Sequence, residues 1–298
     1  MSEPPKVSVS LVGAGRVARG LGWRLREAGW GIAAVAAPRI KSARAAVRVI
    51  GGGSVCVWPS PRVLNAGVIL LAVPDDALAD VVAQLERAGD RDLARKVVLH
   101  TSGALTSAVL APLARRGAWT GVLHPMQTFG ARARPSLEGV LFGVEGHPQA
   151  LRVIRRVVRS LGGESARIDS ARKAHYHAAG TFAAAHVLAA MEAAVQLAVA
   201  AGLKRREATR ALLRLTRQVL ENQELVGPRA AWTGPLSRGD FATIRLHWEA
   251  LATMPAEFRD AYAALSRLAA RLLADSPEPL LERLEQITRR ASAARSGQ

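Results

Sequence analysis

Residues 9 to 18 read Val-Ser-Leu-Val-Gly-Ala-Gly-Arg-Val-Ala, a short apolar strand pattern followed by Gly-x-Gly-x-x-Ala and then by a helical pattern. We expect Gly13 to allow a tight turn, Gly15 to let backbone amides approach a pyrophosphate, and Ala18 to let the helix pack closely on the strand. A helix N-terminus carries unpaired N–H groups and a partial positive charge, so it attracts an anion. With Gly29 ending the helix, this segment predicts the first βαβ unit of a dinucleotide-binding domain.

Strand and helix patterns alternate along the first half of the chain. The apolar run from Val68 to Val73 is typical of a strand that is buried on both faces of a parallel sheet. The pattern predicts an α/β fold in which residues 1–168 form a doubly wound parallel sheet that binds NAD(P). The other expected strands cover residues 31–37, 55–57, 96–100, 117–123, 141–144 and 164–168.

From about Ser170 onward the pattern is helical and contains no convincing strand. We therefore predict that residues 169–298 form an all-α domain, with helices near 171–201, 205–225, 240–251, 255–274 and 277–290.

Composition limits the partners that the chain can have. Its 298 residues are enough for two domains, and 41 basic against 24 acidic residues give a net charge of +17. The arginines are spread along the chain with no aromatic-interleaved basic stripe, so we expect no nucleic-acid partner and a small anionic substrate instead. A solvated basic surface explains the charge equally simply.

Cys56 is the only cysteine, which excludes an intramolecular disulfide and a Cys-based metal site and fits a reducing compartment. The first six residues lead directly into a strand and lack the pattern of a secretory signal, so we expect a cytoplasmic protein with no bound metal.

The stretch from Ala178 to Leu203 is long enough to cross a membrane. It is rich in Ala and is interrupted by His186, Glu192 and Gln196. We therefore expect a buried core helix and no membrane partner.

The end of the second predicted strand indicates which dinucleotide binds. NAD-binding units place an acidic residue there for the ribose hydroxyls, whereas NADP-binding units place an arginine near the 2′-phosphate. Here the chain has no acid and two cations, Arg39 and Lys41, which favours NADP over NAD. The alternative is that both cations are simply solvated loop residues.

Three polar clusters follow predicted strands, where ligands bind in such sheets. The first begins with Val73 and Pro74, the second contains Ser102, and the third contains His124 and Gln127. We expect them to meet in one crevice, although a lone histidine at a strand end is more often structural than catalytic.

A fourth cluster opens the helical region. Lys173, His177 and Thr181 are spaced four residues apart, so they share one face of a helix. A lysine at a domain junction can donate a proton or a hydrogen bond to a carbonyl oxygen as a hydride arrives. The alternative is that Lys173 is an exposed residue of the first helical turn.

Arg238 lies in a glycine-flanked loop before Asp240, which we expect to cap the next helix. Its guanidinium could hold a substrate carboxylate through two parallel hydrogen bonds, or it could be one more surface arginine.

Together these segments resemble bacterial proteins that combine a Rossmann-like domain with a DUF2520 domain. The resemblance rests on the glycine turn, His100 to Leu105, His124 to Phe129, Tyr176 to Gly180 and Thr233 to Pro235. It implies a C-terminal domain of the 6-phosphogluconate dehydrogenase type, a relation to pyrroline-5-carboxylate reductase, and a homodimer built on the helical domain. Some members of this family resemble ketopantoate reductases, so the resemblance also implies ketopantoate as a candidate substrate.

The resulting hypothesis is an NADP-dependent oxidoreductase that transfers a hydride to a small anionic carbonyl compound, such as the 2-keto acid ketopantoate. The alternatives are a cyclic imine reductase and a non-catalytic NADP-binding regulator. The expected catalytic residues are Lys173, His177, His124 and Ser102; the expected cofactor-binding residues are Gly13, Ala14, Gly15, Arg16, Val17, Ala18, Arg39, Val73 and Pro74; the expected substrate-binding residues are Gln127, Thr181 and Arg238.

Overall fold

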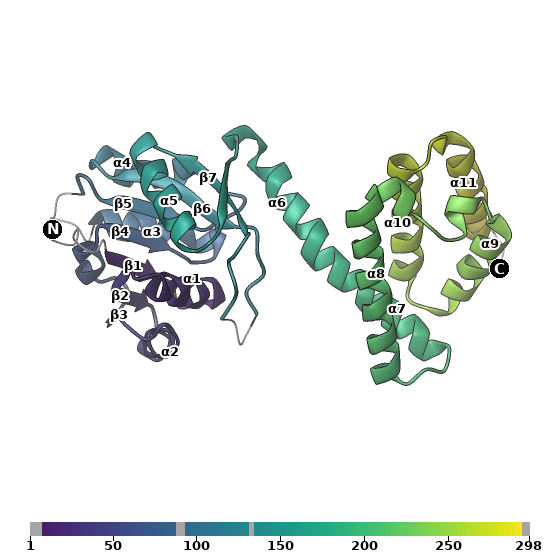
Figure 1. Cartoon of the computed structure of the whole chain (residues 1–298), viewed down its shortest axis with the longest axis horizontal. Coiled ribbons are helices and arrows are strands. Elements are labelled where there is room, and N and C mark those ends of the chain that lie inside the picture. The colour runs from purple at the N-terminus through teal and green to yellow at the C-terminus, as the bar shows by residue number, and fades with distance from the viewer. Residues whose placement is uncertain (1–7, 88–92, 131–133, 294–298) are drawn as a thin grey trace. The chain divides into compact units, whose positions relative to one another are not determined.

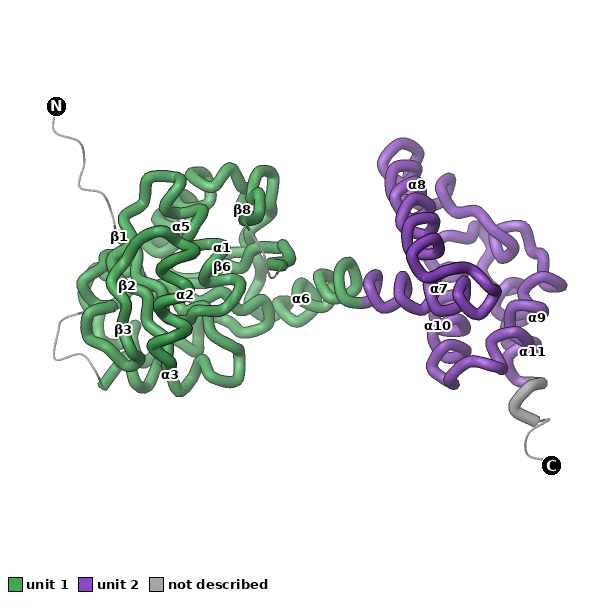
Figure 2. The backbone as a smooth tube through the Cα atoms, turned by 90° about the horizontal axis from the view of Figure 1, so that it is seen from below, with its two compact units in different colours: residues 1–185 green, residues 186–298 purple. Residues whose placement is uncertain are grey.

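The computed structural model describes residues 8–87, 93–130 and 134–293. The chain divides into two compact units, Met1–Ala185 and His186–Gln298, which Figure 2 shows in different colours. The domain boundary predicted at residue 168 falls just after the last strand, whereas the division into units leaves the following helix, α6, with the sheet.

An eight-stranded sheet forms the centre of the first unit, in the order β3-β2-β1-β4-β5-β6-β7-β8. Each of the first five strand pairs is parallel, so the predicted fold is confirmed. The strands are β1 (Ser8–Val12), β2 (Gly31–Ala37), β3 (Ser54–Val57), β4 (Val68–Leu71), β5 (Val97–His100), β6 (Trp119–Pro125), β7 (Leu141–Gly146) and β8 (Glu164–Arg167).

The sheet is mostly parallel, and it departs from the expected parallel arrangement at one strand pair, after which two strands run in the opposite direction. β7 runs antiparallel to β6, with His124 opposite Gly143, and β8 returns parallel to β7. The described residues between β6 and β7, 126–130 and 134–140, contain no crossover helix, which a parallel connection would need.

Helices cover both faces of the sheet, as a doubly wound fold requires (Figure 1). One core contains Leu21, Ile50 and Ile154 from α1, α2 and α5, and the other contains Leu78 and Leu113 from α3 and α4. The helices are α1 (Arg16–Glu27), α2 (Ile40–Ile50), α3 (Asp75–Arg87), α4 (Ala111–Arg115), α5 (Pro148–Ser160) and α6 (Lys173–Thr181).

The second unit is helical throughout its described residues and has its own small core, which includes Ile244, Trp248 and Leu284. A π-helical turn, Phe182–His186, leads from α6 into α7. The helices of this unit are α7 (Val187–Ala200), α8 (Arg205–Ala231), α9 (Phe241–Ala250), α10 (Ala256–Leu273) and α11 (Pro277–Ala293).

The prediction that residues 178–203 form a buried core helix is wrong for the single chain. The helical segment Ser170–Ala200 is long and apolar enough to cross a membrane, yet only 6% of its most apolar window is buried within the single chain. Large apolar side chains on α7 and α8 are exposed, including Leu188 at 72% and Leu225 at 80%. An apolar face of this size on one chain indicates a surface that something else covers.

Candidate active site

The glycine turn has the geometry of a phosphate cradle. Gly13 has φ of +114°, and a Cβ there would overlap the carbonyl oxygen of Ala72, so this position requires glycine. Gly15 is the N-cap of α1, and no side chain caps the helix start. Among the described residues, nothing lies within 4 Å of where a Gly15 Cβ would be. The first amides of α1 therefore face open space and are available to an anion.

The other residues expected to bind the cofactor lie around this turn and at the end of β2, and their roles stay predictions. Ala18 is fully buried, so α1 packs closely on the sheet. Val73 is half-buried, with its Cγ1 3.4 Å from the position of a Gly13 Cβ, and Arg16 and Pro74 are exposed. Arg39 is exposed at the N-cap of α2, directly after β2. The turn and the Arg39 position fit a nucleotide with a 2′-phosphate.

A hydrogen-bonded loop follows β5. The hydroxyl of Ser102 donates to Asp75 Oδ2 at 2.8 Å and accepts from the amides of Ala104 and Leu105. The ring of His100 accepts from the Ser102 amide through Nδ1, and its Nε2 lies 3.1 Å from the Thr106 carbonyl oxygen. Burial lowers the pKa of His100 to about 4, so this ring is a neutral support of the loop.

Lys173 is buried in this loop, with 3% of its surface exposed, so the alternative of an exposed first-turn residue is wrong. Its Nζ donates to the carbonyl oxygen of Ser102 at 3.3 Å. Burial lowers the pKa of Lys173, and the charges of Glu145 and Asp75 oppose that shift. A buried ammonium with a lowered pKa is a stronger acid than an exposed one.

His124 lies at the end of β6 between two aromatic rings of α6. Its Nδ1 is 2.8 Å from the hydroxyl oxygen of Tyr176, and the rings meet edge to face with centroids 5.4 Å apart. The ring of His177 lies on another side, 5.9 Å away. Burial, together with the neighbouring His177 and Lys173, lowers the pKa of His124 to about 4.

A cavity of about 430 Å³ opens beside these histidines. His124, Gln127, His177, Gly180 and Thr181 are among its lining residues. A Cβ on Gly180 would meet nothing within 4 Å among the described residues, so this helix position borders open space.

The structure thus brings four of the predicted residues, His124, His177, Gln127 and Thr181, to one cavity. Ser102 lies in the loop after β5, and Lys173, at the start of α6, donates to its carbonyl oxygen; the next residue of that loop, Gly103, packs against both His124 and His177. The roles of all these residues remain predictions.

Arg238 belongs to the second unit, where it is exposed at the end of a short 3₁₀ helix, Leu236–Arg238. Its proposed role is likewise a prediction.

Sequence reasoning missed Tyr176, Asp75 and Glu145. Tyr176 follows Lys173 by three residues, a spacing that places the two on one helix face and could have identified it. Glu145 is 4% exposed and accepts from the Ser107 amide at 2.5 Å. No sequence pattern marks Glu145, because its strand pairs in the direction that was not expected.

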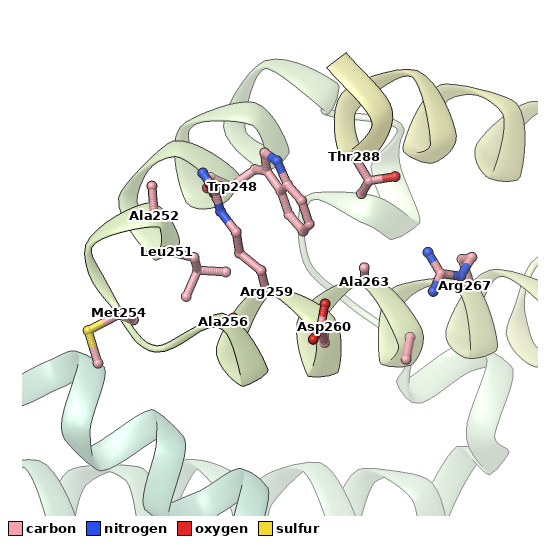
Figure 3. A pocket seen from close by; sticks show the side chains of 11 residues that line it. Trp248, Leu251, Ala252, Met254, Ala256, Arg259, Asp260, Ala263, Arg267 and Thr288 are labelled. Atoms are coloured by element: carbon pink, nitrogen blue, oxygen red, sulfur yellow. Dashed lines mark hydrogen bonds between the residues drawn. The ribbon is translucent and has the colours of Figure 1, made fainter. Parts of the chain in front are cut away.

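The second unit contains another cavity, of about 620 Å³, shown in Figure 3. Arg259 crosses one side of it and donates twice to the carbonyl oxygen of Trp248, with its guanidinium 5.0 Å from the indole ring centre. This arginine therefore supports the α9–α10 corner, and the cavity holds none of the predicted site residues.

The parallel sheet and the glycine turn define a protein of the dinucleotide-binding class. Residues 2–125 match the Rossmann-like domain family, and residues 140–269 match the domain of unknown function DUF2520. The chain therefore combines a match to each of these two domains, as its sequence predicted.

Solved structures share this architecture over most of the chain. A candidate NADP oxidoreductase from Bacteroides fragilis has a TM-score of 0.75 at 23% identity and covers 88% of this chain and 97% of its own. An imine reductase from a Pseudomonas species has a TM-score of 0.66 at 20% identity, with coverage of 94% and 99%. A reductive aminase from Aspergillus terreus, solved with NADPH and ethyl-5-oxohexanoate, has a TM-score of 0.64 at 18% identity, with coverage of 89% and 94%. No curated protein sequence matches the chain. At these identities the likeness establishes the fold.

Proposed function

We propose that this protein is an NADP-dependent reductase that transfers a hydride to a small carbonyl or imine compound. The observation that carries the proposal is that the first unit contains both an uncapped, glycine-lined helix start after β1 and a cavity lined by two histidines, one of them at the end of β6. The names of the similar structures, which include NADP oxidoreductases, an imine reductase and a reductive aminase, support the same class.

NADPH, when bound, would supply the hydride. The amides at the start of α1 would hold its pyrophosphate, and Arg39 would pair with the 2′-phosphate. The residues proposed to line the cofactor site are Gly13, Ala14, Gly15, Arg16, Val17, Ala18, Arg39, Val73 and Pro74.

The loop and the cavity supply the polar groups for the substrate. Lys173 stabilises negative charge on the substrate oxygen or nitrogen and gives it a proton, because burial makes this ammonium a stronger acid. His124 and His177 donate hydrogen bonds from the cavity wall, and Gln127 and Thr181 orient the substrate. Ser102 acts through its carbonyl oxygen, which positions Lys173.

The first substrate class to test is a small 2-keto acid such as ketopantoate. This choice rests on the family resemblance. A cyclic imine is the second candidate, and the imine reductase and the reductive aminase among the similar structures favour it.

We further propose that the protein is a cytoplasmic homodimer joined through its helical unit, with no nucleic-acid or membrane partner. Exposed apolar side chains on α7 and α8, such as Leu188, Leu220 and Leu225, support this arrangement because burial against a second copy would remove them from water.

The experiment is a fluorescence titration with NADPH and NADH, followed by a screen for NADPH oxidation over 2-keto acids and cyclic imines. Tight binding of NADPH with turnover of one class supports the proposal, and binding of neither nucleotide refutes it. Binding without turnover of any carbonyl or imine would favour the regulator instead.

The site assignment has a separate test. Lys173→Gln and His177→Ala should each lower turnover about tenfold or more while NADPH affinity stays the same, since the loss of a hydrogen bond to the reacting group is worth about 1–3 kcal/mol. His175→Ala is the matched control, because His175 is exposed on the same helix and contributes to none of the described contacts of the site. Unchanged turnover in both site variants would overturn the assignment.

A further inference from the structure

Tyr176 and His124 are in hydrogen-bond contact, and the position of the shared hydrogen determines which nitrogen of His124 can donate a hydrogen bond. The hydroxyl oxygen of Tyr176 lies 2.8 Å from His124 Nδ1 and 3.4 Å from the His124 carbonyl oxygen. The backbone of Gly143, opposite His124 in the sheet, also hydrogen-bonds this hydroxyl. A side chain at residue 143 would place its Cβ 2.5 Å from the Tyr176 oxygen, so glycine makes room for the contact.

A phenol has a single hydrogen to donate, and the 2.8 Å contact is the better placed of its two acceptors. A phenol is also a stronger acid than a neutral imidazole N–H, which favours donation from the hydroxyl to the ring nitrogen. If Tyr176 donates to Nδ1, that nitrogen carries no hydrogen and the hydrogen of the neutral ring sits on Nε2.

His124 Nε2 is the ring nitrogen on the side of His177 and Gly103. It lies 2.7 Å from where a Gly103 Cβ would be, and His177 Cδ2 lies 2.5 Å from the same point. No described residue is recorded as a hydrogen-bond partner of this nitrogen, and His124 lines the 430 Å³ cavity.

We propose that Tyr176 is a positioning residue that holds His124 in its Nε2–H form, so that His124 donates a hydrogen bond to the carbonyl or imine of the substrate without giving up its proton. This inference rests on the proposed function and assigns its proton transfer to a different residue, Lys173. A neutral ring suits this role because it keeps one tautomer over the whole neutral pH range, whereas a charged ring would donate from both nitrogens.

The chain contains its own control pair. Of its two tyrosines, the other is Tyr262, whose hydroxyl lies 3.0 Å from His247 Nδ1, with the rings edge to face and centroids 6.0 Å apart. This pair has the same local geometry in the second unit, between α9 and α10, and lines none of the cavity beside His124.

The test records proton–nitrogen correlation spectra of histidine rings in the full ¹⁵N-labelled chain at neutral pH, without cofactor or substrate. His124→Gln identifies the His124 signals. The parent chain should show His124 with an unprotonated Nδ1 and a protonated Nε2. Tyr176→Phe should change this to a mixture of tautomers or to the Nδ1–H form, and Tyr262→Phe should leave it as it is. A protonated Nδ1 in the parent chain, or an unchanged His124 in Tyr176→Phe, would overturn the proposal.

Activity gives the second measurement. Tyr176→Phe should lower kcat about tenfold with little change in KM, the size expected for one lost hydrogen bond, and Tyr262→Phe should not. Gly143→Ala displaces the hydroxyl without removing it and should reproduce both changes if the variant remains folded. Because the spectra are taken without ligands, they test the tautomer even if the protein proves not to be a reductase, and NADPH binding tests that function independently.

Discussion

Substitution of alanine at two glycines of the same turn should have different effects, one on stability and the other on cofactor binding. Gly13→Ala adds a Cβ where φ is +114° and where the carbonyl carbon of Ala72 lies 2.8 Å away. Gly15→Ala adds the same group where φ is −72° and where nothing lies within 4 Å among the described residues. Gly13→Ala should therefore lower stability, and Gly15→Ala should affect only the binding of a ligand in the turn.

The expected sizes follow from these geometries. A non-glycine residue in such a backbone conformation costs about 1–3 kcal/mol, and overpacking against a backbone carbonyl adds about 1–3 kcal/mol. Gly13→Ala should therefore lose about 2–6 kcal/mol of a total free energy of unfolding of about 5–15 kcal/mol. Gly15→Ala should change the free energy of unfolding by less than about 0.5 kcal/mol. It should weaken NADPH binding about 10- to 100-fold, because amide contacts to the pyrophosphate worth about 1–3 kcal/mol are lost.

The assays are urea unfolding and NADPH titration by fluorescence, both on the full chain. If Gly15→Ala is as destabilised as Gly13→Ala, the open space in front of α1 is not what the structure indicates. If Gly15→Ala binds NADPH as tightly as the parent chain, the turn does not cradle the pyrophosphate.

Three further predictions concern the charge at β2, the buried histidine and the exposed apolar helices. Arg39→Ala should weaken NADPH binding about tenfold and leave NADH binding nearly unchanged, because only NADPH carries the 2′-phosphate, and equal losses in two parallel titrations would contradict that role. The folded-state pKa of His100 is about 4 against 6.5 in the unfolded chain, so the unfolded state gains its proton first as the pH falls. The contribution of His100 to stability should therefore be full above pH 6.5 and fall by about 3 kcal/mol as the pH drops to 4, and the similar shift of His124 should add to this fall. Urea unfolding at several pH values measures how steeply the free energy of unfolding falls with pH. This dependence should be shallower in His100→Asn than in the parent chain and unchanged in His175→Gln. Equal dependences in the parent chain and both variants would refute His100 as the cause. Leu188→Glu combined with Leu225→Glu should convert the dimer to a monomer in light scattering after gel filtration, since both side chains are exposed on the single chain, and an unchanged mass would place the interface elsewhere.

Much of the first unit could be predicted because local sequence determines it. The glycine turn, the strand at Gly31–Ala37 and the buried run that forms β4 all depend on residue size and apolar pattern within a few positions. The direction of β7 could not be predicted in this way, because β7 is buried on both faces, and a strand covered on both faces is an apolar run in either direction. The buried Glu145 and the Gly143 backbone contact to Tyr176 depend on that direction, so neither could be predicted.

The burial of the helix at 178–203 could not be predicted from its apolar pattern. Its pattern is apolar on nearly every face, which in one chain suggests burial in that chain's own core. The structure leaves most of it exposed, because apolar composition indicates that a surface is covered but not which molecule covers it. The site was predicted in part for a similar reason: strand ends and helix spacing located Lys173, His177 and His124, whereas the pairing of His124 with Tyr176 required the sheet register.

The reversed strand also determines where this protein could acquire new specificity. Pro125, the last residue of β6, pairs with Phe142 near the start of β7, so the connecting segment leaves the sheet and returns to it at the same edge. That segment begins with Met126, Gln127 and Thr128, which line the cavity beside His124. An insertion or deletion there would reshape the wall of the cavity without moving any strand out of register, because loop closure tolerates added length at low cost. We expect natural variants with different substrates to differ in length between residues 126 and 140 more than in any crossover of the sheet.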